Sequence, residues 1–190
     1  MKKFVVLCAM FACVIGADAR ATTTNALRVL FIGNSFTVYN NLPALVAQLA
    51  ATNGRRMVVE RLAKGGANFQ QHCEMLDACN RIASGAWDVV VLQNHSSEPL
   101  RDPSNMFAYG RLVCDTANDS EARTVLFLTW AYAAAPNDTT SVINANVLPR
   151  MQDRLNEAYY QMAFDSNAEV APVGRAFAAV RAAHPEWPLH

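Results

Sequence analysis

The sequence has no excess of charge of either sign and no long run of basic residues. Its 190 residues carry 16 Lys and Arg against 16 Asp and Glu, so the formal net charge is zero. A nucleic-acid-binding surface normally depends on clustered Lys and Arg side chains. The sequence therefore predicts no nucleic-acid partner.

The sequence also has no apolar run of the roughly 20 residues that a membrane-spanning helix needs. Its amino-terminal apolar run, residues 4–16, follows Lys2-Lys3 and precedes Ala17-Asp18-Ala19. That order of basic, apolar and small residues is typical of a secretory signal peptide. We expect residues 1–19 to be the signal peptide and residues 20–27 a short leader. The protein is then exported, to the periplasm or outside the cell, without stable insertion in a membrane.

Cysteine is scarce once the signal peptide is set aside. Cys73, Cys79 and Cys114 remain, and an odd number cannot all pair within one chain. Cys73 and Cys79 lie six residues apart in one predicted helix, so we expect them to face different sides and to form no bridge. No His and Cys residues have the spacing of a zinc site, so no metal is expected.

Apolar runs alternate with segments of helical periodicity along the rest of the chain. The runs predict strands at residues 28–32, 57–62, 87–92, 124–129 and 169–173. The periodic segments predict helices at residues 42–53, 68–84, 104–118, 149–164 and 174–183. This alternation is typical of an α/β fold with three α/β/α layers and a flavodoxin-like, five-stranded parallel sheet. We expect one domain over residues 28–190.

The first predicted strand ends abruptly at Gly33-Asn34-Ser35, and a helix-period segment follows. In an open α/β sheet this turn lies at the carboxyl end of the strand, where ligands bind. The first N–H groups of a helix there favour an anion, such as the tetrahedral intermediate of ester hydrolysis. The same three residues are also ordinary turn and cap residues, so this stretch alone leaves both interpretations open.

Polar residues or glycines follow the next three predicted strands as well. They are Gly65-Gly66, then Gln93-Asn94-His95-Ser96, then Trp130 and Tyr132. The carboxyl ends of parallel strands meet at one edge of a sheet, so we expect these turns to lie near Ser35.

At these turns the sequence resembles the SGNH hydrolases, also called GDSL esterases and lipases. Gly33-Asn34-Ser35-Phe36-Thr37 resembles the nucleophile block, with Asn34 where many members carry Asp. Gly66 resembles the glycine whose backbone N–H contributes to the oxyanion hole. Gln93-Asn94-His95-Ser96 occupies the third block, where many members have Gly-x-Asn-Asp.

The resemblance implies acyl transfer without a cofactor, on a small-molecule or carbohydrate ester, acetyl esters in particular. Ser35 is then the nucleophile, and its own N–H, the Gly66 N–H and the Asn94 side chain form the oxyanion hole. Gln93 is the second choice for the side-chain donor, because its amide N–H₂ could do the same work. The residues expected to line the substrate are Asn34, His95, Trp130 and Tyr132.

The main departure from the family pattern lies at the carboxyl end. Members carry Asp-x-x-His there, which supplies the acid and base of the triad. His184 has Arg181 rather than Asp three residues earlier, and His190 has no Asp at that spacing. We therefore expect a domain truncated at its carboxyl end, or an inactive SGNH-like domain that binds a ligand without turnover. His95 is a candidate substitute base.

Trp130 and Tyr132 have two competing interpretations. They form either a wall that stacks on sugar rings or a cap on the core with one edge exposed to solvent. We expect His72 to lie on the surface of its helix, and Asp88 to have a structural role at the opposite edge of the sheet.

A flavodoxin-like protein that binds a cofactor is the remaining alternative for the function. The chain lacks both G-x-G-x-x-G and a Walker loop, the motifs that would support it.

Overall fold

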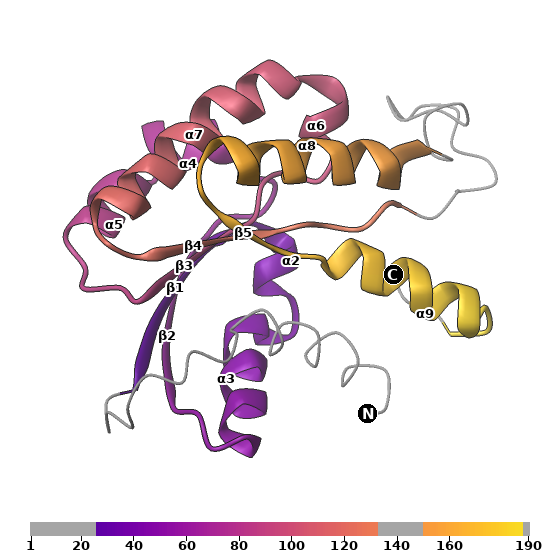
Figure 1. The fold of residues 1–190 in the computed structure, drawn as a ribbon, viewed down its shortest axis with the longest axis horizontal. Coiled ribbons are helices and arrows are strands. Elements are labelled where there is room, and N and C mark those ends of the chain that lie inside the picture. Colours follow the sequence, from indigo (N-terminus) through magenta and orange to yellow (C-terminus); the bar gives the residue numbers. More distant parts are fainter. Residues whose placement is uncertain (1–25, 133–149, 188–190) are drawn as a thin grey trace.

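The computed structural model describes residues 26–132 and 150–187, which form three layers (Figure 1). The middle layer is a five-stranded sheet with the order β2-β1-β3-β4-β5. The strands are β1 (Leu27–Gly33), β2 (Met57–Ala63), β3 (Val89–Leu92), β4 (Arg123–Phe127) and β5 (Glu169–Ala171). All neighbouring strands are parallel, which confirms the predicted fold class.

The helices form the two outer layers. One face of the sheet is covered by α4 (Phe69–Glu74), α5 (Ala78–Ala83), α6 (Glu98–Arg101), α7 (Pro103–Asp119) and α8 (Met151–Asp165) (Figure 1). The other face is covered by α3 (Leu42–Thr52) and α9 (Val173–Ala183). A short helix, α2 (Ser35–Val38), and a 3₁₀ turn connect β1 to α3.

Alternate residues of β1 supply the two cores. Val29 and Phe31 belong to the cluster under α3 and α9, whereas Leu30 and Ile32 belong to the cluster under the other helices. All four side chains are at most 1% exposed. A strand covered on both faces needs an apolar residue at every position, which explains the unbroken apolar run in the sequence.

The structure corrects one predicted element, the single helix over residues 68–84. It is two helices, α4 and α5, separated by a break at Asp77, whose φ of 58° is left-handed. Asp is one of the few residues besides Gly that adopt this conformation at modest cost. The break lets both Phe69 of α4 and Ile82 of α5 be fully buried.

The break also corrects the expectation for Cys73 and Cys79. Their sulfur atoms do not face different sides of one helix but lie 3.8 Å apart. Both side chains are partly buried, and both are free thiols.

Several predicted features lie outside the described residues. They are the signal peptide, most of the leader, the loop over residues 133–140 and Pro149, the first residue of the helix predicted over residues 149–164. Among the helices that the structure does describe, none is both long and apolar enough to cross a bilayer.

The close approach of α9 to the end of β4 gives a testable prediction. A Cβ atom at Gly174 would lie 2.1 Å from the backbone oxygen of Thr129, which cannot move without displacing the chain. We expect Gly174→Ala to lower the free energy of unfolding by about 1–3 kcal/mol, the usual cost of overpacking. Chemical denaturation monitored by circular dichroism measures this change.

Gly65→Ala is the matched control, since a Cβ atom at Gly65 has nothing within 4 Å. We expect the control to change the free energy of unfolding by less than about 0.5 kcal/mol. Equal stability of the two variants would contradict the close contact between α9 and Thr129.

Candidate active site

Ser35 is the first residue of α2, directly after β1. The preceding residue, Asn34, caps this helix, and its Oδ1 accepts a hydrogen bond from the N–H of Phe36 at 3.2 Å. Ser35 is partly exposed, while Asn34 is only 3% exposed. Among the described residues, no group hydrogen-bonds to the Ser35 hydroxyl. The hydroxyl is therefore not committed to a structural contact within this part of the chain.

The turn after β2 is attached to the turn that carries Ser35. The N–H of Lys64 donates to the carbonyl oxygen of Gly33 at 3.2 Å. Asn34 Nδ2 donates to the carbonyl oxygen of Ala67 at 3.0 Å. Between these contacts lies Gly66, an exposed residue with a φ of +72°. A side chain would be strained in that conformation, so glycine suits the position.

Gln93, directly after β3, is attached to the same turn from the other side. Its Oε1 accepts from the N–H of Asn34 at 2.9 Å and from the hydroxyl of Thr37 at 3.0 Å. Its Nε2 donates to the carbonyl oxygen of Asn94 at 2.5 Å. Both ends of this buried amide have partners within the protein, and one of the two N–H donors of Gln93 is already used.

Asn94 differs from Gln93 in one respect. The N–H of Phe69 donates to its Oδ1 at 2.9 Å, which fixes the orientation of the amide. Its Nδ2 is buried and has no hydrogen-bond partner among the described residues. An unpartnered buried donor costs about 1–3 kcal/mol, and an added acceptor oxygen would recover that cost.

His72 does not lie on the surface of its helix as predicted but is completely buried. Its Nε2 lies 2.9 Å from the carbonyl oxygen of Gly33, and a carbonyl can only accept, so Nε2 carries the proton. Its Nδ1 has no partner among the described residues. Burial lowers the pKa of His72, although the hydrogen bond to Gly33 acts in the opposite direction. The sequence contained a signal for this burial, because His72 lies three residues after the buried Phe69 and shares its helix face.

His95 has its basic nitrogen turned into its own loop. The backbone N–H of Ser97 donates to Nδ1 at 3.3 Å, and the Ser97 hydroxyl lies 3.1 Å from the same atom. A backbone N–H can only donate, so Nδ1 carries the lone pair and a neutral ring has its hydrogen on Nε2. In this form Nε2 cannot take a proton from Ser35. The arrangement argues against His95 as a substitute base.

The Trp130 ring, predicted to stack on a sugar, already stacks on two aromatic rings of the protein. Its ring stacks against Phe36 on α2, with centroids 4.3 Å apart, and against Phe177 on α9, with centroids 4.2 Å apart. Tyr132 is held by a hydrogen bond between its hydroxyl and that of Ser96. The aromatic stack joins α9 to the helix that begins at Ser35, which favours the interpretation of Trp130 as a cap on the core.

Asn34 was also expected to line the substrate, but its side-chain oxygen and nitrogen both hydrogen-bond to other residues of the protein.

Asp88 lies at the opposite edge of the sheet, as expected, where its Oδ2 accepts a hydrogen bond from the N–H of Arg28 at 2.6 Å. The stacking of Trp130 and the contacts of Gln93, His72 and Thr37 were not found from the sequence.

The site's three turns are thus joined by hydrogen bonds between their own residues. Phe69 and Asn94 join the third turn to the start of α4, and Asn34 contacts both neighbouring turns. The turn that carries the partly exposed Ser35 is therefore bonded both to the Gly66 turn and to the turn that carries the buried Asn94 amide. Such an arrangement can supply a nucleophile and several donors to one carbonyl group.

Comparisons with known proteins show which solved structures share this fold. A protein from Slackia heliotrinireducens, described as an SGNH hydrolase, is 30% identical, with a TM-score of 0.69; the match covers 82% of this chain and 83% of that one. An acetyl xylan esterase, AlAXEase, is 15% identical with a TM-score of 0.63 and 84% of each chain covered. AlinE4, an SGNH-hydrolase family esterase, is 13% identical with a TM-score of 0.61, covering 89% and 86% of the two chains. No family model and no curated protein sequence matches this chain.

The 30% identity over most of both chains shows the family, and the two esterases share the fold. The chain belongs to the SGNH hydrolases.

The buried position of His72 gives a prediction about pH. Its pKa is lowered from 6.5 in the folded protein, so the unfolded chain binds more protons near and below pH 6.5. The stability that His72 contributes as a neutral residue is therefore present above pH 6.5 and is lost as the pH falls below it. We expect the melting temperature of the wild type to fall more between pH 7 and about pH 5 than that of His72→Gln.

Gln at this position can still donate to Gly33 but does not titrate in this range. His184→Gln is the control, because His184 is exposed at the end of α9, and we expect it to keep the wild-type dependence on pH. Parallel melting curves for the wild type and His72→Gln would show that His72 is not a buried neutral histidine.

Proposed function

We propose that this protein is a secreted serine esterase of the SGNH type. Its substrates are acyl esters, acetyl esters in particular, with esters carried on carbohydrates as the candidate class. The proposal for the acyl group is supported by a structural neighbour whose printed name is acetyl xylan esterase. Export is supported by the signal-peptide pattern at residues 1–19.

The observation that carries the proposal is the set of hydrogen bonds around Asn34. They join the turn that bears Ser35 to the turn that bears Gly66 and to the turn that bears Asn94. The uncommitted Ser35 hydroxyl and the unpartnered Asn94 Nδ2 are then the nucleophile and one oxyanion donor. The backbone N–H groups of Ser35 and Gly66 are the other donors.

The reaction proceeds in two steps. Ser35 Oγ attacks the ester carbonyl, its proton passes to a base, and the negative charge on the carbonyl oxygen is held by the donors. The carbon–oxygen bond to the alcohol then breaks, and the alcohol leaves with a proton. Water hydrolyses the acyl-serine and restores the hydroxyl.

No base for the first step is found among the described residues. The described residues include His72, His95 and His184, and none of them hydrogen-bonds to Ser35. Loss of the histidine from a serine triad costs about 10⁶ in turnover. A domain that binds an ester or its products without turnover is therefore the second candidate function, favoured by this one observation.

A fluorophosphonate probe tests the nucleophile separately from the base. We expect the 190-residue chain to label Ser35 slowly, because no histidine among the described residues hydrogen-bonds to its hydroxyl. Imidazole in solution can act as an exogenous base. We expect it to raise the labelling rate at Ser35 by at least about tenfold, which is less than the roughly 10²–10⁴-fold that a positioned base contributes. Mass spectrometry of the labelled peptide identifies the residue.

Ser35→Ala is expected to remove the label, and His95→Ala is expected to leave it unchanged. Labelling at Ser96 or Ser97 instead, or no imidazole-dependent labelling of Ser35, would contradict Ser35 as the nucleophile. Rapid labelling without imidazole would show that the chain supplies its own base and would reject the binding-only function.

A further inference from the structure

The break between α4 and α5 brings two thiols together. In an unbroken helix, residues six apart lie about 9 Å apart along the axis and point in different directions. The left-handed conformation of Asp77 turns the chain, and the sulfur atoms of Cys73 and Cys79 then lie 3.8 Å apart. A disulfide has a sulfur–sulfur bond of about 2 Å, so the two atoms need to approach by less than 2 Å.

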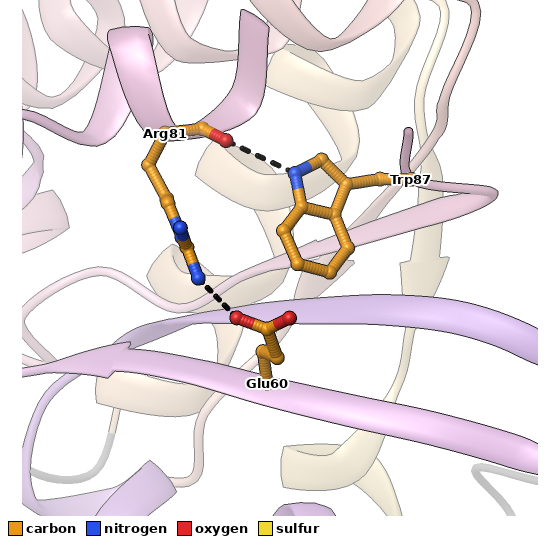
Figure 2. Close-up of polar contacts among 3 residues, drawn as sticks. All are labelled: Glu60, Arg81 and Trp87. Carbon is orange, nitrogen blue, oxygen red and sulfur yellow. Dashed lines mark hydrogen bonds and ion pairs between the residues drawn. The ribbon is translucent and has the colours of Figure 1, made fainter. Parts of the chain in front are cut away.

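The helix that carries Cys79 is held against the sheet by Arg81 (Figure 2). The guanidinium of Arg81 forms an ion pair with Glu60 on β2, and the carbonyl oxygen of Arg81 accepts from Trp87 Nε1 at 3.0 Å. The Arg81 guanidinium also lies 5.6 Å from the centre of the Trp87 ring. The position of α5 is therefore fixed by contacts of both the side chain and the backbone of Arg81.

The helix that carries Cys73 is held by a different set of contacts. Asn68 and Gln71 form a reciprocal capping box at its start. Phe69 is fully buried, and His72, the neighbour of Cys73, is bonded to Gly33. Each helix is held in place by its own contacts. The two thiols therefore stay adjacent even when no bond joins them.

We propose that Cys73 and Cys79 form a disulfide by exchange with a small disulfide such as oxidised glutathione. The thiolate of one cysteine attacks a glutathione sulfur and releases one glutathione thiolate. The second cysteine then attacks the mixed disulfide, forms the Cys73–Cys79 bond and releases the second glutathione. The two cysteines are oxidised by two electrons, glutathione disulfide is reduced by two, and the two thiol protons pass to the released thiolates.

Two observations bear on the rate and the specificity of this exchange. Burial and the neighbouring Cys79 raise the pKa of Cys73, so the thiolate is scarce at neutral pH and the uncatalysed exchange is slow. Cys114 is fully buried in α7, and among the described residues its sulfur has no hydrogen bond to another cysteine, unlike those of Cys73 and Cys79. Cys114 is therefore not expected to exchange while the protein is folded.

The Cys73–Cys79 disulfide lies in a segment that contacts the candidate active site. The helix that carries Cys73 begins at Phe69, three residues after Gly66, and the N–H of Phe69 donates to Asn94. A cross-link between α4 and α5 restricts opening of this segment and restricts the unfolded chain. We expect the melting temperature to rise by about 5 °C on oxidation, the size usual for a short loop in a domain of this length.

Peptide mapping of the folded full chain, incubated with oxidised glutathione at pH 8, tests the proposal. Trypsin releases residues 65–81 as one peptide that contains both cysteines. We expect this peptide to lose two hydrogen atoms in mass and to resist alkylation until a reductant is added. Cleavage after Glu74 should then give two fragments that remain linked.

Cys79→Ser is expected to abolish the linked product, and Cys114→Ala, the matched control, is expected to retain it. Free thiols at both positions in the oxidised wild type would overturn the proposal. So would separate glutathione adducts, or a bond from either cysteine to a different peptide or to a second chain. The mapping of the wild type decides the question even where a variant folds poorly.

Discussion

The candidate site depends on one buried amide oxygen, Oε1 of Gln93. It accepts from the backbone of Asn34 and from the hydroxyl of Thr37, so the end of β3 holds both sides of the turn that contains Ser35. The approach is close enough to require glycine at position 33, where a Cβ atom would lie 2.7 Å from this oxygen and 2.2 Å from the Thr37 hydroxyl oxygen. Gly33 is thus required for the close approach of two neighbouring strands, as well as for the turn.

The groups that join the three turns are neutral. Asn34, Gln93 and Asn94 supply amides, and His72 supplies a neutral imidazole. Buried amides with partners at both ends hold a loop without the desolvation cost that an ion pair would bring. The Nδ2 of Asn94 is the exception, and the exception falls where the proposed reaction develops negative charge.

The fold could be predicted from the sequence because its signals are local. Unbroken apolar runs marked β1 and β3, and the helical spacing of apolar residues marked the longer helices. The break at Asp77 could not be predicted in this way, because Phe69, Cys73 and Ile82 keep the spacing of one helix, and only packing on the sheet separates α4 from α5. The helical spacing from Phe69 could have placed His72 on the buried face, but its hydrogen bond to Gly33 is a tertiary contact that the sequence does not show.

The site could be predicted as a set of turns but not as a set of contacts. Parallel strands bring their carboxyl ends to one edge, so the turns could be placed together from the sequence, and the resemblance to the SGNH hydrolases then selected Ser35, Gly66 and Asn94 within them. Which amide of the third block keeps a donor without a partner depends on how each side chain is used within the protein. Gln93 contacts the turn of Ser35, and Asn94 contacts the start of α4. The partners of Trp130 come from α2 and α9, which lie far apart in the sequence.

Hydrogen exchange at the backbone amide of Asn34, followed by NMR, tests most directly whether Gln93 holds the turn. In the wild type this amide should exchange slowly, as the amides within β1 do, because it is buried and donates to Gln93. In Gln93→Leu we predict that its exchange accelerates by about tenfold, the equivalent of one lost hydrogen bond, while the amides within β1 keep their rates. Fast exchange of the Asn34 amide in the wild type, or an unchanged rate in Gln93→Leu, would contradict the account.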